Sequence, residues 1–116
     1  MQLFNTRGHK LQRFTPLHPD SVRMYSCGPT VYNHAHIGNL SSYIYADILR
    51  RTLRQCFGTT KHVMNITDVD DKTIRDSLAK YPDQPPRQAL QRLTDHYQQI
   101  FLDEMRAVGN SIDDIT

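Results

Sequence analysis

The 116-residue sequence carries a net charge of +2, 38% hydrophobic residues and two cysteines. This length fits one domain with a small core, and the charge gives no indication of nucleic-acid binding through a basic face. No apolar run of about 18 residues is present, which excludes a membrane-spanning helix, and residues 1–11 do not resemble a signal peptide. We therefore expect a cytoplasmic protein with reduced thiols and no membrane partner.

An N-terminal hairpin or edge strand is followed by a predicted corner between a strand and a helix. Residues 21–26 form a short extended run, and the apolar spacing becomes helical from Leu40 onward. The first N–H groups of a helix lack partners and carry partial positive charge, so such a corner binds phosphates. Gly28 and Gly38 would allow a ligand to approach the backbone closely. His36 and Asn39 lie three residues apart at the helix start, where both side chains can donate to triphosphate oxygens.

The helix that follows is predicted to end at Gly58 and to be amphipathic. Its expected inward face is apolar and consists of Tyr45, Ile48, Leu49, Leu53 and Cys56. Its expected solvated face consists of Asp47, Arg50, Arg51 and Arg54. Cys56 is thus expected to be buried, whereas Cys27, outside the helix, is a candidate ligand. His62 and His96 are expected at the surface.

A β-rich run at residues 60–66 predicts a second strand, parallel to the first, with the helix as the crossover. Thr67 and Asp68 then suit a helix N-cap. Asp68, Asp70 and Asp71 are interpreted as residues that complement this helix start, in preference to magnesium ligands.

The last predicted helix begins at Pro86, after a proline-interrupted connection at residues 81–86, and ends before Gly109. The tail at residues 110–116 is polar and expected to fray. The helix carries one apolar stripe, made of Leu90, Leu93, Tyr97, Phe101, Met105 and Val108.

Two sequence blocks carry a resemblance to a known family. The first is C-G-P-T-V-Y at residues 27–32 followed by H-I-G-N at residues 36–39, and the second is N-I-T-D-V-D-D-K at residues 65–72. Both blocks, in this order and at this spacing, resemble the cysteine-tRNA ligases, which are class I aminoacyl-tRNA synthetases. The opening L-F-N-T at residues 3–6 is also similar to the first strand of that family.

The resemblance implies ATP-dependent activation of cysteine and its ligation to tRNA(Cys). It implies that His36 and Asn39 are the catalytic residues. It also implies that Cys27 is a ligand of a Zn²⁺ ion, and that this ion binds the substrate thiolate. ATP, together with Mg²⁺, is the implied nucleotide substrate. The implied ATP-binding residues are Pro29, Thr30, His36, Gly38 and Asn39. The implied cysteine-binding residues are Cys27, Gly28, Thr30 and Thr67. A local zinc site of Cys27, His34 and His36 is less favoured, because three ligands on one tight turn rarely reach tetrahedral geometry.

The implied fold is α/β, the N-terminal part of a Rossmann-type nucleotide-binding domain with a parallel βαβ unit and a long C-terminal helix. Two parallel strands make only half of a doubly wound sheet. Residues 1–116 are therefore interpreted as a partial catalytic domain with no second domain, and the chain alone is expected to be inactive. Two alternatives remain open at this point: a fragment of a cysteine:amino-sugar ligase of the mycothiol type, and a non-catalytic adenylate-binding module.

Overall fold

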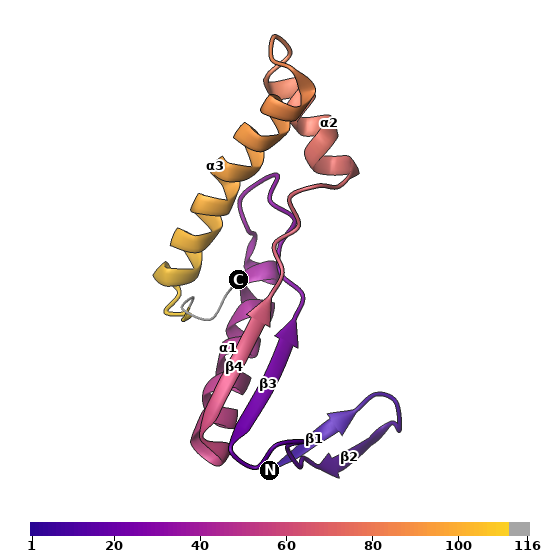
Figure 1. The fold of residues 1–116 in the computed structure, drawn as a ribbon, viewed down its shortest axis with the longest axis vertical. Helices are drawn as coiled ribbons and strands as arrows, with labels where there is room; N and C mark the ends of the chain where they lie inside the picture. The colour runs from indigo at the N-terminus through magenta and orange to yellow at the C-terminus, as the bar shows by residue number, and fades with distance from the viewer. Residues whose placement is uncertain (112–116) are drawn as a thin grey trace.

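The computed structural model describes residues 1–111 of the chain. These residues form an N-terminal hairpin, a two-stranded parallel sheet with a crossover helix, and two further helices (Figure 1). Residues 112–116, the last part of the predicted tail at residues 110–116, lie outside the described residues. The elements are β1 (Gln2–Asn5), β2 (Lys10–Arg13), β3 (Ser21–Ser26), α1 (Ile37–Phe57), β4 (Thr59–Met64), α2 (Asp71–Lys80) and α3 (Pro86–Ala107).

The predicted parallel βαβ unit is confirmed. Strands β3 and β4 pair in parallel from Ser21 opposite Thr59 to Ser26 opposite Met64, and α1 connects them. Helix α1 packs on one face of this sheet (Figure 1). The other face leaves the Tyr25 side chain 68% exposed. Both strands run to the same end of the sheet, so the segments that follow them emerge side by side.

The predicted inward face of α1 is wrong for three residues: Tyr45 and Ile48 are exposed, and so is Cys56. The buried residues of α1 are Tyr43, Asp47, Arg50 and Leu53. Asp47 and Arg50 are only 6% and 5% exposed, although both were expected on the solvated face. Apolar periodicity failed here because an ion pair allows two charged side chains to lie inward.

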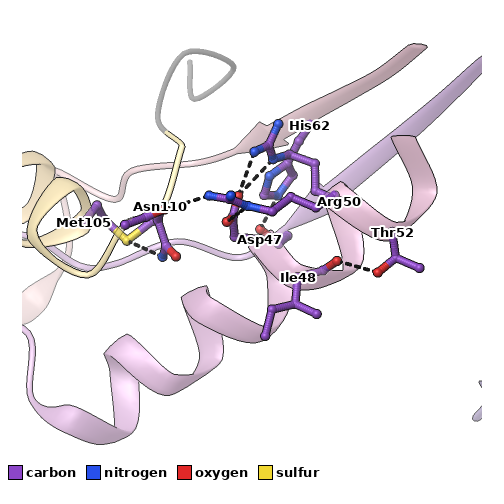
Figure 2. Close-up of polar contacts among 10 residues, drawn as sticks. Asp47, Ile48, Arg50, Thr52, His62, Met105 and Asn110 are labelled. Atoms are coloured by element: carbon purple, nitrogen blue, oxygen red, sulfur yellow. Dashed lines mark hydrogen bonds and ion pairs between the residues drawn. The ribbon is translucent and has the colours of Figure 1, made fainter. Parts of the chain in front are cut away.

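Figure 2 shows the ion pair of Asp47 and Arg50, and Arg51 links the same carboxylate to the segment that follows α3. Arg50 donates to Asp47 Oδ1 at 3.0 Å from Nε and 2.8 Å from Nη2. Arg51 donates to Asp47 Oδ2 at 2.6 Å and to the Gly109 carbonyl at 2.7 Å. Burial alone would raise the pKa of Asp47, but the hydrogen bonds and the positive charges of both arginines together outweigh it and lower that pKa.

Two more surface expectations are corrected. His62 is 3% exposed, and its Nε2 lies 2.8 Å from Ser26 Oγ in a hydrogen bond between the paired strands (Figure 2). Asn110 was expected to fray, but it is buried, with its Nδ2 3.3 Å from Met105 Sδ. His96 is exposed, as expected. Pairing with a hydroxyl or a thioether gives these polar groups a place inside the protein.

The N-cap of α2 lies further along the chain than the predicted Thr67 and Asp68. Asp70 is the N-cap, and its Oδ1 accepts the backbone N–H groups of Lys72 at 2.7 Å and Thr73 at 3.1 Å. Thr67 cannot start the helix because its N–H and carbonyl bind other backbone groups. The prediction that the acidic residues complement the helix start is confirmed for Asp70, and Asp71 lies in the first turn.

Helix α3 begins at Pro86, as predicted, and its C-terminal half, the lower half in Figure 1, packs against α1 and β4. The core cluster consists of Tyr43, Met64, Phe101 and Met105. The upper half of α3 packs on α2, away from the sheet (Figure 1). The molecule is therefore elongated, measuring 55 × 29 × 26 Å. Among the described residues, no helix has the length and apolar character that crossing a bilayer requires.

Candidate functional site: a cleft between the two sequence blocks

The two sequence blocks lie beside each other at the carboxyl ends of β3 and β4. Thr30 and Thr67 form an isolated parallel bridge. The Thr67 N–H donates to the Pro29 carbonyl at 2.9 Å, and the Val31 N–H donates to the Thr67 carbonyl at 3.1 Å. The blocks are therefore joined by backbone hydrogen bonds that extend the parallel pairing beyond the strands. This arrangement brings the predicted residues Thr30 and Thr67 together.

Asn65 ties the same region together through its side chain. Its Oδ1 accepts the Tyr25 hydroxyl at 2.8 Å and the Gly28 N–H at 3.2 Å, and its Nδ2 donates to Thr67 Oγ1 at 3.2 Å. A β-carbon on Gly28 would lie 1.9 Å from the Asn65 carbonyl oxygen. The group that approaches Gly28 closely is thus the Asn65 backbone, whereas the sequence had suggested a ligand. Asn65 belongs to the second sequence block, but these side-chain contacts were not predicted from the sequence.

His36 is the N-cap of α1, in a reciprocal pair with Asn39. His36 Nδ1 accepts the Asn39 N–H at 3.3 Å, and Asn39 Oδ1 accepts the His36 N–H at 3.4 Å. Because Nδ1 is an acceptor, the neutral ring carries its proton on Nε2. A β-carbon on Gly38 would lie 3.0 Å from the His36 ring, so glycine makes room for the ring at the helix start. Both side chains keep N–H donors: Nε2 of His36 and Nδ2 of Asn39.

A cleft of about 510 Å³ opens at this helix start. Of the predicted site residues, Gly28, Pro29, Thr30, His36 and Asn39 line it. Gly38, Cys27 and Thr67 are not among its lining residues. The remaining lining residues are Val31, Tyr32, Asn33, His34, Ala35, Tyr43, Lys72 and Phe101.

Lys72 is the one lysine or arginine among the cleft-lining residues. Its Nζ lies 5.3 Å from the centroid of the Tyr32 ring, which also lines the cleft. Lys72 is the second residue of α2, so the Asp70 cap holds the start of its helix in place. An ammonium at this position gives the cleft a positive charge. The sequence signal for Lys72 was its place at the end of the second block.

Cys27 lies directly after β3 with an exposed side chain. It is close to Tyr43: burial raises the pKa of Tyr43, and the nearby Cys27 thiolate raises it further. Within residues 1–111, no group of three or more His, Cys, Asp or Glu side chains is arranged to hold a metal ion. Cys27 therefore offers one thiol, and the described residues do not by themselves form a zinc site.

Glu104, on α3, contacts the segment just before His36, a connection that sequence reasoning missed. One carboxylate oxygen lies 2.8 Å from His34 Nδ1, and the other accepts the Ala35 N–H at 3.1 Å. These residues are about 70 positions apart in the sequence, and no periodicity or spacing links them.

The comparisons with known proteins agree on one family. The family model described as tRNA synthetases class I (C) catalytic domain matches residues 13–113. The cysteine-tRNA ligase of Koribacter versatilis is 44% identical over 109 residues, which are 94% of this chain and 21% of that protein. The cysteine-tRNA ligase of Solibacter usitatus is 42% identical over 106 residues, covering 91% of this chain and 22% of the relative. The cysteine-tRNA ligase of Rhodopseudomonas palustris strain BisA53 is 45% identical over 112 residues, covering 94% of this chain and 24% of that relative. The chain thus spans about a fifth of the length of these curated relatives.

Proposed function

The chain belongs to the class I (C) tRNA synthetase catalytic-domain family, and on that premise we propose that it supplies part of the active site of a cysteine-tRNA ligase. In this reaction the cysteine carboxylate attacks the α-phosphate of ATP and pyrophosphate leaves; the cysteinyl group of the resulting adenylate then passes to the 3' end of tRNA(Cys), and AMP leaves. Residues 1–116 are proposed to form a partial catalytic domain that acts in the cytoplasm. The relatives' names favour this function over an amino-sugar ligase or a non-catalytic module.

The observation that carries the proposal is the set of donors gathered at the cleft. His36 Nε2 and Asn39 Nδ2 both keep N–H donors at the N-terminus of α1, and the Lys72 ammonium lines the same cleft. Negative charge on the phosphate oxygens shifts as the α-phosphate is attacked, and fixed donors stabilise that change without reorganising. We assign His36 and Asn39 as the catalytic residues. Pro29, Thr30 and Gly38 complete the proposed ATP-binding segment, and Mg²⁺ would accompany ATP.

The cysteine side is proposed to be formed by Cys27, Gly28, Thr30 and Thr67, which follow β3 and β4. We propose Cys27 as one ligand of a zinc ion whose other ligands come from outside the described residues. Bound zinc favours a soft thiolate over a hydroxyl, which matters because a pocket that relies on shape separates near-isosteres by only about 100-fold. The Thr30–Thr67 bridge supports this assignment, because it joins the two sequence blocks that supply these residues.

A chimaera tests the proposal directly. The matching segment of the Koribacter enzyme is replaced by this chain, and cysteine-dependent ATP–pyrophosphate exchange and charging of tRNA(Cys) are measured. We expect the chimaera to activate cysteine, because the chain carries both blocks of the site. The purified chain alone is the control and should stay at background. A folded chimaera that binds neither ATP nor cysteine and shows no exchange would refute the proposal.

A further inference from the structure

We propose that Glu104 is a positioning residue for the ATP side of the site: it holds the segment that presents His36 and Asn39. This inference rests on the proposed function and adds to it a residue from the far end of the described chain. Glu104 is not among the residues that line the cleft, so its carboxylate acts through the segment it binds and not on the nucleotide.

The segment before α1 depends on this carboxylate for its shape. Residues 33–36 lie outside regular secondary structure, between the turn after Thr30 and the first residue of α1. Glu104 binds two consecutive residues there, His34 through the ring and Ala35 through the backbone N–H, at 2.8 and 3.1 Å. Hydrogen bonds that involve an ionised carboxylate are stronger than neutral ones. The next residue along the chain is His36.

The part of α3 that carries Glu104 is packed in the core. Phe101 and Met105, on either side of it in α3, are 3% and 2% exposed and belong to the core cluster with Tyr43 and Met64. The Glu104 side chain is only 25% exposed. A carboxylate fixed by core packing can transmit the position of α3 to the start of α1. The His34 ring also contacts Tyr97 of α3 edge to face, with centroids 5.9 Å apart.

The test compares Glu104→Ala, Glu104→Gln and a matched control, Asp103→Ala. Asp103 is the neighbouring carboxylate of α3, and it binds Arg106 and Gln99 on the same helix. Hydrogen–deuterium exchange of the 116-residue chain reports on the amides of residues 34–39, with the amides of β3 and β4 as an internal reference for folding. Pyrophosphate exchange in the chimaera gives kcat and the KM values for ATP and cysteine.

We expect Glu104→Ala to speed exchange at residues 34–39 and to lower kcat/KM for ATP about tenfold, because both hydrogen bonds of the carboxylate to the segment are lost. The KM for cysteine should stay unchanged. Glu104→Gln keeps an oxygen that accepts the Ala35 N–H, so its losses should be smaller, and Asp103→Ala should match the wild type in both measurements.

Three results would overturn the proposal. Unchanged exchange at residues 34–39 in Glu104→Ala would show that the carboxylate does not hold the segment. Faster exchange with unaltered kinetics for ATP would leave Glu104 a structural contact without a positioning role. If the wild-type chimaera is inactive, the proposed function fails and the kinetic part of this proposal fails with it, while the exchange experiment still reports whether the contact exists.

Discussion

His36 caps α1 with one ring nitrogen and keeps the other free. The Asn39 N–H occupies Nδ1, so the proton of the neutral ring is on Nε2, the atom available to a ligand in the cleft. The Asn39 amide oxygen accepts the His36 backbone N–H, which leaves the Nδ2 hydrogens of Asn39 able to donate. The same pair of hydrogen bonds that begins the helix therefore orients the two proposed donors.

The capping role and the donor role of His36 can be separated by two substitutions of this residue in the chimaera. His36→Ala removes both the cap and the donor, whereas His36→Asn keeps a capping oxygen but shortens the reach of the donor. Both should lower the activation rate by about 10² to 10³, the usual cost of one transition-state donor, with little change in the KM for cysteine. Pyrophosphate exchange and thermal melts are measured together, with His96→Ala as the control. Normal rates in a folded His36→Asn variant would contradict the donor role.

Cys27 is expected to act on the other substrate. In the chimaera, Cys27→Ser should raise the KM for cysteine and weaken the rejection of serine, because a hydroxyl is a poorer ligand for zinc than a thiolate. The KM for ATP should change little. Exchange assays with both amino acids measure this, and Cys56→Ser, at the other cysteine of the chain and outside both sequence blocks, is the control. Equal losses for cysteine and ATP would instead indicate a general disturbance of the strand end.

Among the secondary structure elements, α1 shows how charged side chains can decide which face turns inward. Asp47 is buried against Arg50, and Arg51 extends the contact to the Gly109 carbonyl at the end of α3. Replacing Asp47 would take its carboxylate away from the buried Arg50 guanidinium, and breaking a buried pair is far more costly than losing an exposed one. The contact therefore links α1 to the turn that follows α3.

Replacing Asp47 should destabilise the protein in a pH-dependent way. At pH 7, Asp47→Asn is expected to lower the free energy of unfolding by about 3 kcal/mol. The folded-state pKa of Asp47 is lowered, so its contribution is complete above the unfolded value of about 3.9 and is lost as the pH falls through the folded value. Urea unfolding from pH 7 down to pH 2.5 should show the difference from wild type shrinking below about pH 4. Asp83→Asn, at an exposed loop residue, is the control; a pH-independent difference would contradict this account.

The elements could be predicted from the sequence wherever the signal is local. Gly58 ends α1 with a φ of 84°, a conformation that favours glycine, and Pro86 begins α3. Predictions failed where a distant partner decides. His62 can be buried because its ring is hydrogen-bonded to Ser26, which lies 36 residues away in the sequence. Thr67 cannot cap a helix because it pairs with the Pro29–Val31 segment.

The same limit applies to the candidate site. The residues of the two blocks could be placed together from sequence because parallel strands end at one edge of their sheet, and five of the predicted residues line the cleft. Glu104 gave no such signal, since its contacts with His34 and Ala35 depend on how α3 packs against α1. Neither composition nor periodicity reports on packing of that kind.

As a whole molecule, the chain is extended for its length. Its radius of gyration is 17.3 Å, whereas about 13 Å is expected for a compact domain of this size. The parallel sheet has two strands and one covered face, and α2 with the upper half of α3 projects beyond it (Figure 1). This shape agrees with a segment that matches about a fifth of its relatives' length.

Zinc binding by the purified chain is expected to be weak. Cys27 is the one member of the proposed ligand set within residues 1–111, and a single thiolate does not hold the ion against water and buffer. After washing with chelator, the chain should retain far less than one equivalent of zinc when measured by atomic absorption. Stoichiometric zinc that disappears in Cys27→Ala would instead support a local site with His34 and His36.

The outward side chains of α1 turn Cys56 into a chemical reporter. Tyr45, Ile48 and Cys56 are exposed on this helix although two of them are large and apolar, and such surfaces are commonly covered by further protein. The Cys56 thiol should therefore react readily with iodoacetamide in the isolated chain and slowly in the chimaera, where more polypeptide surrounds it. Mass spectrometry of the labelled peptides would follow, through one native sulfur atom, how this segment becomes enclosed in a larger protein.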